Sequence, residues 1–259
     1  MESMGVPIFE PEKLKHLFPQ FKQGSAGKVF KVMYDNQLAC LKIGHSLHQI
    51  NDYPLEVGKM HCLDGAGGAP QLIAACSNIP LFVTTYCPGI TIQDWVKNDT
   101  NPVTPMELLQ VCLEVALRLK EIHVKGIIHN DINPNNIILD FQDKHYTRAH
   151  IIDFNLSTHY GSSLGLWNPN NRNHEKKYPW IAPEVYHGHT SCSSSDVFSL
   201  GYLFSYVTRT LIEQDRIPSH APQIAFLEHL AGAMNTYFEN RISISQVIDV
   251  LSSALYRKN

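Results

Sequence analysis

The residues best suited to chemistry lie in and after the segment Gly126–Asp140, which reads GIIHNDINPNNIILD. Asp131 and Asn136 share its polar, proline-broken loop, and Asp153 ends the next apolar stretch. Hairpin pairing of the flanking strands would bring Asn136 and Asp153 together as oxygen ligands for a hard cation such as Mg²⁺. Asp131 would then be available to orient or deprotonate an attacking hydroxyl. The alternative is that these side chains only stabilise turns of the loop.

A lysine and two glycines near the start of the chain could serve the same chemistry. Lys42 ends an apolar strand, where an unpaired buried charge is costly, and Glu56 is the only glutamate between it and Asp64. The sequence is equally compatible with a Lys42–Glu56 ion pair and with a lysine whose ammonium group reaches water. Gly24 and Gly27 in QGSAGK would let the backbone approach a phosphate, although two such glycines are more often an ordinary turn.

The elements that must position these residues are predicted to be mainly strands in the first third of the chain. The expected strands are residues 28–33, 38–44, 70–76 and 80–87. Asp35 and Asn36 form the turn between the first two strands, and Pro54 suits the first turn of a helix. Pro88-Gly89 closes this part, so we place a lobe boundary near residues 85–89.

The rest of the chain is predicted to be mainly helical. Thr104 and Glu107 form a capping box at the start of an apolar helix that ends at Gly126. Two short strands, a long irregular segment and two helices follow. Their expected ranges are 136–140 and 148–153 for the strands, 154–180 for the irregular segment, and 195–211 and 241–257 for the helices.

The composition is that of an ordinary globular protein and excludes several classes of function. Of the 259 residues, 44% are hydrophobic, and the formal net charge of −3 argues against a nucleic-acid-binding protein. We expect no membrane span, because no apolar run approaches about 18 residues, and no secretory signal, because the start lacks a basic region. The six cysteines form no C-x-x-C pair and most lie in apolar runs, which indicates a reducing compartment. We therefore expect a cytoplasmic protein, with the nucleus left open as a second location.

The order of all these features along the chain resembles that of the eukaryotic-type protein kinase family. The matching features are Gly24 and Gly27, Lys42, Glu56, His129-x-Asp131-(x)4-Asn136, Asp153-Phe154, Ala182-Pro183-Glu184, Asp196 in SDVFSLG, and Arg241. Each motif is weak alone, but the series is specific and covers almost the whole chain. The resemblance implies one protein kinase domain over residues 1–259 with an α+β fold of two lobes. The β-rich N-lobe, with a five-stranded sheet and one helix, would span about 14–85, the hinge about 85–89 and the helical C-lobe about 90–259.

The resemblance also implies ATP and Mg²⁺ as ligands and assigns a role to each matching residue. Asp131 would be the catalytic base, Asn136 and Asp153 would bind Mg²⁺, and Lys42, paired with Glu56, would hold the α- and β-phosphates. The residues implied in ATP binding are Gly24, Ser25, Gly27, Val29, Cys40, Lys42, Thr84, Thr85, Cys87, Ile138 and Asp153. Among these, Thr84 would be the gatekeeper, Thr85 to Cys87 the hinge that binds adenine, and Cys40 and Ile138 would lie above and beneath the adenine ring. Glu184 and Arg241 would form a buried ion pair, and Asp196 would hold the backbone of the catalytic loop.

Several positions depart from the family pattern. Lys22 replaces the first glycine of the phosphate loop, and the Gly-Thr pair ahead of Ala182-Pro183-Glu184 is missing. Asn130 replaces the arginine that pairs with a phosphorylated activation loop, so we hypothesise that activity does not depend on such phosphorylation. Asn133 replaces a lysine that neutralises the transferred group, and losing one such donor can cost on the order of 100-fold in rate. Asn155 replaces a glycine, and asparagine tolerates the positive φ that this turn would need.

These features together predict an ATP-dependent protein kinase that phosphorylates serine or threonine, with slow turnover. The alternative is a nucleotide-binding pseudokinase or scaffold, which the asparagine substitutions favour. A small-molecule phosphotransferase of related fold would also carry the H-x-D-x-x-x-x-N loop. The motifs around Glu184, Asp196 and Arg241 argue against it, because they build a platform for a protein substrate.

Overall fold

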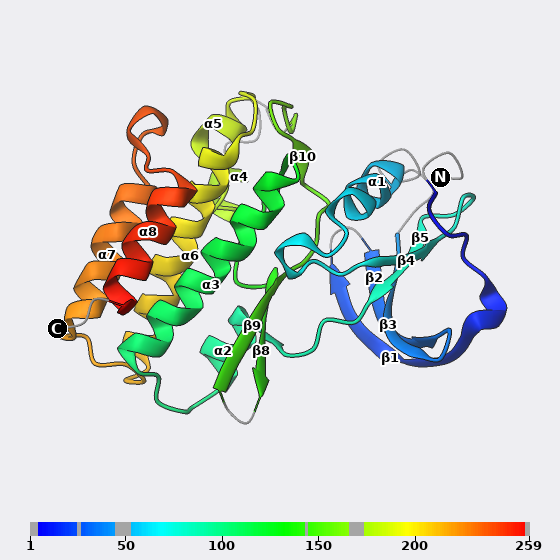
Figure 1. Cartoon of the computed structure of the whole chain (residues 1–259), viewed down its shortest axis with the longest axis horizontal. Helices are drawn as coiled ribbons and strands as arrows, with labels where there is room; N and C mark the ends of the chain where they lie inside the picture. Colours follow the sequence, from blue (N-terminus) through cyan, green and yellow to red (C-terminus); the bar gives the residue numbers. More distant parts are fainter. Residues whose placement is uncertain (1–4, 25–26, 45–52, 143–144, 166–173, 257–259) are drawn as a thin grey trace. The chain divides into compact units, whose positions relative to one another are not determined.

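The chain divides between Cys87 and Pro88 into two units, which are described separately here. The computed structural model describes residues 5–24, 27–44, 53–142, 145–165 and 174–256 (Figure 1). Strands predominate over helices in the first unit and helices over strands in the second, which confirms the predicted α+β class. The division lies within residues 85–89, where the sequence places the lobe boundary.

The first unit contains one antiparallel sheet of five strands in the order β1-β2-β3-β5-β4. The strands are β1 (Leu14–Gly24), β2 (Gly27–Tyr34), β3 (Gln37–Ile43), β4 (Leu72–Ala75) and β5 (Leu81–Thr85). The predicted turn between β2 and β3 has φ of 48° at Asp35 and 59° at Asn36, a backbone that these residue types tolerate. The pattern does not predict β1, because Pro19 interrupts it.

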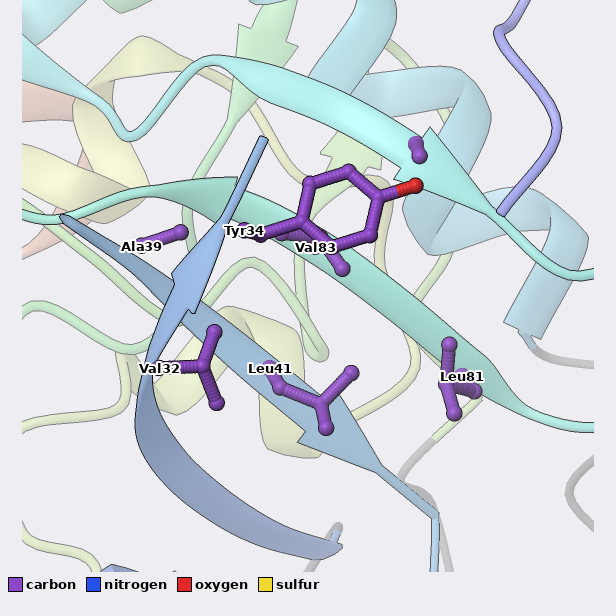
Figure 2. Close-up of a cluster of buried hydrophobic side chains, with 7 residues drawn as sticks. Val32, Tyr34, Ala39, Leu41, Leu81 and Val83 are labelled. Atoms are coloured by element: carbon purple, nitrogen blue, oxygen red, sulfur yellow. The ribbon is translucent and has the colours of Figure 1, made fainter. Parts of the chain in front are cut away.

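Both faces of this sheet are covered, and the strand sequences show why. In β5, Leu81 and Val83 pack with Val32, Tyr34 and Leu41 in the cluster drawn in Figure 2. The intervening Phe82 belongs to a second cluster on the other face. Successive side chains of a strand point to opposite faces, so a strand buried on both sides is continuously apolar.

The second cluster is formed by the helix of the first unit, α1 (Tyr53–Leu63). Tyr53 and Val57 of this helix pack against Ala75 and Phe82 of the sheet. The start of α1 confirms the helix start predicted from Pro54. Two short 3-10 helices, η2 (Pro11–Lys13) and η4 (Ala66–Gly68), complete the unit.

Four long helices of the second unit lie side by side in Figure 1 and form most of its core. They are α3 (Pro105–Val124), α6 (Ser193–Glu213), α7 (Pro222–Met234) and α8 (Ile244–Tyr256). The predicted capping box of α3 is present, with Thr104 Oγ1 accepting from Glu107 N at 3.1 Å and Thr104 N donating to Glu107 Oε2 at 2.8 Å. The approach of α6 to α7 needs Gly201, because an added Cβ would lie 2.7 Å from Met234 Cβ. Within the described parts of the chain, no helix has the length and apolar character needed to span a bilayer.

The second unit also contains several short helices and strands. The shorter helices are α2 (Ile92–Asn98), α4 (His174–Lys177), α5 (Pro183–Tyr186) and the 3-10 helix η5 (Phe238–Asn240). One small sheet has the order β6 (Ile90–Thr91), β8 (Ile137–Gln142) and β9 (His145–Ile151), and β7 (Ile127–Ile128) pairs with β10 (Thr158–His159). The segment 154–180, predicted to be irregular, therefore contains β10 and α4. Two paired residues are too few to give a strand pattern in the sequence.

The predicted hairpin of residues 136–140 and 148–153 forms as β8 and β9, with different ends. Its last paired residues are Ile137 and Ile151, so Asn136 and Asp153 lie just beyond the ladder instead of within it. The amide of Ile152 still donates to the Asn136 carbonyl at 2.9 Å. The hairpin thus fixes the backbone of the chain on both sides of the predicted cation ligands.

Candidate active site

In the first unit, Lys42 at the end of β3 forms an ion pair with Glu56 in the first turn of α1. Lys42 Nζ lies 2.6 Å from Glu56 Oε1, and their side chains are only 15% and 11% exposed. The lysine therefore does not simply extend into water, which was the other interpretation of the sequence. The Lys42 ammonium also lies 5.6 Å from the centroid of the Phe82 ring. The helix and the sheet together hold one cation at a defined place.

Residues expected to surround a nucleotide base and its phosphates lie on neighbouring strands of the same unit. Val29 on β2 pairs with Lys42, and Cys40 on β3 pairs with the buried Thr84 on β5. Gln71 N donates to Thr85 Oγ1 at 2.9 Å. These pairings place a half-buried valine beside the lysine and a thiol beside the threonine.

Two of the predicted nucleotide-binding residues, Cys40 and Cys87, carry thiols with raised pKa values. Burial raises the pKa of Cys40 to about 11 and that of Cys87 to about 12. Both side chains therefore remain protonated near neutral pH and act as small apolar groups. For Cys40, this property is compatible with the predicted contact with the face of the adenine ring.

One glycine of the predicted phosphate loop, Gly27, has a structural role in the sheet. Gly24 and Gly27 pair at the ends of β1 and β2, and Ser25 lies outside the described residues. A Cβ at residue 27 would collide with the Ile43 carbonyl oxygen of β3. Gly27 is thus required by the packing of the sheet itself, whether or not a phosphate binds nearby.

In the second unit, three neutral N–H groups converge on the carboxylate of Asp131. Asn133 Nδ2 donates to Oδ1 at 2.9 Å, and Asn136 Nδ2 donates to Oδ2 at 2.7 Å. Trp180 Nε1, from the segment before α5, donates to Oδ1 at 2.7 Å. The amides of Asn133 and Asn136 also donate to the main-chain oxygen of Asp131. Together these contacts fix both the backbone and the side chain of Asp131.

The acidity of Asp131 reflects this environment. Burial raises the pKa of the Asp131 carboxyl above its ordinary value, and the negative charge of Asp153 acts in the same direction. Interaction with His129 and the N–H donors of Trp180 and Asn133 opposes the rise. A carboxyl with a raised pKa is a stronger base than an exposed one, which suits the abstraction of a proton.

Asp196, at the start of α6, binds the backbone of the loop that carries Asp131. Its carboxylate is fully buried and accepts from His129 N and Asn130 N, each at 2.7 Å. His123 Nε2 lies 2.9 Å from the same carboxylate. The structure thus places Asp196 where the family resemblance expects it, on the backbone of the loop.

Asn130, at the position of the family's arginine, is buried and holds the start of the following segment. Its Nδ2 donates to the Leu156 carbonyl and to Thr158 Oγ1, both at 3.0 Å. Thr158 belongs to β10, which pairs with β7 directly before the loop. A neutral amide therefore ties the segment after Asp153 to the loop that carries Asp131.

The two predicted cation ligands flank the hairpin, with Asn136 before β8 and Asp153 after β9, and their chemistry suits Mg²⁺. The amide nitrogen of Asn136 donates to the main-chain oxygen and to Oδ2 of Asp131, so it faces Asp131. The amide oxygen is then the atom of this side chain that could bind a cation. The Asp153 side chain is exposed, and Asn155 Nδ2 donates to its Oδ1. An amide oxygen and a carboxylate are hard donors of the kind that Mg²⁺ prefers.

The turn after Asp153 forms in a different way from the one expected. The positive φ, 68°, belongs to Asp153 and not to Asn155. The fully buried Phe154 anchors the turn, with its ring 4.9 Å from that of His129. The backbone strain is thus placed two residues before the substituted glycine position, so Asn155 is accommodated without a left-handed conformation.

Two further predictions concern the surroundings of the loop. Arg241 Nη1 lies 2.7 Å from Glu184 Oε1, so the expected buried ion pair forms, and Arg241 also donates to the Ser194 carbonyl. Ile138 is half-buried on β8 between the fully buried Ile137 and Leu139, so it faces away from their core. Within the described residues, no group of three or more His, Cys, Asp or Glu side chains could hold a metal ion.

The functional contact that the sequence does not predict is that of Trp180 with Asp131. The two residues are 49 positions apart, and nothing in the pattern PWIAPE reports a partner for the indole. The other residues form two separate groups, one within each unit. Lys42, Glu56 and Val29 lie together in the first unit, and Asp131, Asn133 and Asn136 in the second.

In comparisons with known proteins, this chain is similar to protein kinases. The family model for the protein kinase domain matches residues 19–257 of the chain. A probable serine/threonine-protein kinase of Dictyostelium discoideum is 26% identical over 156 residues, which are 57% of this chain and 24% of that protein. The RGS domain-containing serine/threonine-protein kinase A of the same organism is 26% identical over 192 residues, 72% of this chain and 16% of that protein.

A bacterial protein is similar to a comparable degree. Serine/threonine-protein kinase PrkC of Bacillus subtilis is 27% identical over 132 residues, which are 51% of this chain and 19% of that protein. The chain spans 24% or less of the length of these three relatives.

Proposed function

Since the chain belongs to the protein kinase family, we propose that it is an ATP-dependent enzyme that transfers the γ-phosphate of ATP to a serine or threonine hydroxyl of a protein. The observation that carries the proposal is the carboxylate of Asp131, oriented by Asn133, Asn136 and Trp180 in a loop whose backbone is itself fixed. A loop with only a structural role would not need its carboxylate to be oriented in this way. The preference for serine or threonine is supported by the names of the relatives and not by a residue of this chain.

Each residue would have a separate part in the transfer. Asp131 would accept the proton of the attacking hydroxyl, and Lys42, held by Glu56, would bind the α- and β-phosphates. The amide oxygen of Asn136 and the carboxylate of Asp153 would hold Mg²⁺. When bound, the ion would neutralise charge on the phosphates.

The loop around Asp131 has no lysine or arginine, which implies slow turnover. Asn133 donates a hydrogen bond to Asp131 but brings no positive charge to the transferred group. Loss of one charge-stabilising donor costs roughly 100-fold in rate. We therefore propose a slow enzyme and not an efficient one.

We further propose that the activity does not depend on phosphorylation of the segment after Asp153. Asn130 supports this, because its amide already binds the Leu156 carbonyl and Thr158 without any phosphate. A neutral amide also offers no charge to a phosphoryl group. The segment would therefore be held in one arrangement from the outset.

The second candidate is a nucleotide-binding pseudokinase or scaffold, favoured by the absence of charge at Asn130, Asn133 and Asn135. Two measurements on the same preparation discriminate the candidates. Binding of ATP with Mg²⁺ is measured by calorimetry, and phosphate transfer is measured on a peptide library. The enzyme proposal predicts both. Binding without transfer, even at high protein concentration, would select the pseudokinase.

A further inference from the structure

Trp180 is held rigidly, and its N–H group points at Asp131. The indole ring meets the Tyr178 ring edge-on at a centroid distance of 5.7 Å, and the Tyr202 ring of α6 lies 6.2 Å away. Rings on two sides leave few orientations for the indole. Its Nε1 lies 2.7 Å from Asp131 Oδ1, a short distance for a neutral donor.

The segment that carries Trp180 is anchored in the core of the second unit. Trp180 packs against a buried cluster that includes Ile181, Ala182, Val185 and Tyr186. The hydroxyl of Tyr186 donates to the Tyr178 carbonyl at 3.0 Å. The position of the indole is therefore set by the same packing that seats the predicted substrate platform.

The donors are distributed unequally over the two oxygens of Asp131. Oδ1 accepts from both Trp180 and Asn133, whereas Oδ2 accepts from Asn136. A carboxylate has about four acceptor positions, two on each oxygen. Among the described residues, the donors thus fill Oδ1 and leave one position on Oδ2. An incoming hydroxyl would bind there.

We propose that Trp180 is a positioning residue: its indole N–H fixes the orientation of the Asp131 carboxylate and leaves Oδ2 to receive the acceptor hydroxyl. The inference rests on the proposed phosphotransfer and deepens it. It links the seating of the segment before Ala182-Pro183-Glu184 to the alignment of the base. A platform that is displaced would release the carboxylate, even though Asp131 itself is unchanged.

The variant Trp180→Phe tests the proposal, because it keeps an aromatic ring and removes the N–H donor. Trp95→Phe is the matched control, since Trp95 lies on α2 with its ring beside Phe141 and Arg216. We expect kcat of Trp180→Phe to fall about 10- to 100-fold, as for a catalytic group that is displaced. KM for ATP and the melting temperature should stay close to those of the wild type, and Trp95→Phe should keep its kcat.

A measurement on the unchanged indole covers the possibility that Trp180→Phe does not fold. The chain has three tryptophans, so Trp95→Phe and Trp167→Phe assign the third indole signal in a nitrogen–proton correlation spectrum. We expect Asp131→Ala to move the Trp180 indole resonance and to leave that of Trp95 in place. An unmoved Trp180 signal would show that the bond is not formed and would overturn the proposal.

The kinetic outcomes separate this proposal from that of the function. If the wild type transfers phosphate and Trp180→Phe retains its kcat within twofold, the positioning role is wrong and the kinase function stands. If kcat and thermal stability fall together while KM for ATP rises, the role of Trp180 is only structural. If the wild type transfers no phosphate, the proposed function fails, and the positioning role fails with it.

Discussion

The first unit holds Lys42 with an opposite charge, whereas the second unit holds Asp131 with neutral amides and an indole. Lys42 and Glu56 form an ion pair of 2.6 Å, and Asp131 receives donors from Asn133, Asn136 and Trp180. A carboxylate can therefore be oriented by the direction of neutral N–H groups. Charge would then be needed for the reacting phosphate and not for the shape of the loop.

The largest effect should come from removing the buried Asp196 carboxylate, which binds the backbone of the loop around Asp131. Asp196→Ala would leave the buried N–H groups of His129 and Asn130 without their acceptor. We expect the free energy of unfolding of the second unit to fall by about 3 to 5 kcal/mol. Urea unfolding followed by tryptophan fluorescence measures this, because all three tryptophans lie after residue 87.

The control for that variant is Asp249→Ala on the exposed side of α8. It should change the free energy of unfolding by no more than about 0.5 kcal/mol. If Asp196→Ala were as mild as this control, the loop would keep its shape without Asp196 and our account of its support would be wrong.

The charged pair of the first unit is tested next, through Lys42→Met. Loss of a cation from the phosphates should lower the rate of phosphate transfer about 100-fold or more. Lys13→Met is a matched control, because Lys13 also pairs with a glutamate, at 2.9 Å, but in an exposed position. Initial rates with a peptide substrate measure both variants. A rate for Lys42→Met above about a third of wild type would remove Lys42 from the proposed machinery.

Giving the loop a cation sharpens the comparison. Asn133→Lys would restore a charge beside Asp131, and we expect the rate of transfer to rise about tenfold. Asn133→Gln is the control, because it keeps an amide and adds no charge. The same peptide assay compares the two. A fall in rate for both variants would mean that the hydrogen bonds of Asn133 matter more than charge at this position.

The smallest effect is expected from phosphatase treatment of the purified protein. Asn130 already ties the segment after Asp153 to the loop, so removal of phosphate should change the rate by less than about twofold. Mass spectrometry verifies that phosphate has been removed. Complete loss of activity would show that the segment needs a phosphoryl group after all.

Local signals in the sequence predicted much of this architecture. The capping box of Thr104 and Glu107, the turn at Asp35 and Asn36, and the apolar pattern of α6 each act within a few residues. Such signals depend on backbone preferences and on the period of a helix or strand. They gave the type of most long elements, with small errors at their ends.

The contacts that complete the site join residues far apart in the chain and were less predictable. The pairing of Lys42 with Glu56 was one of two equal alternatives until the packing of α1 on the sheet decided it. The bond between Trp180 and Asp131 has no local signal, because it depends on how α5 and α6 seat the indole. The positive φ of the turn was expected at Asn155, whereas the structure has it at Asp153, beside the buried Phe154.

The most direct test of the central claim compares the wild type with Asp131→Asn in an assay with ATP, Mg²⁺ and a peptide substrate. The amide oxygen can still accept from Trp180 and Asn133, and only the donor of Asn136 loses its side-chain acceptor, so most contacts of the loop should remain while its base is lost. We predict phosphate transfer by the wild type and a loss of at least about 100-fold in the variant, with unchanged binding of ATP. Equal labelling by both proteins would mean that a contaminant is responsible and would contradict the account.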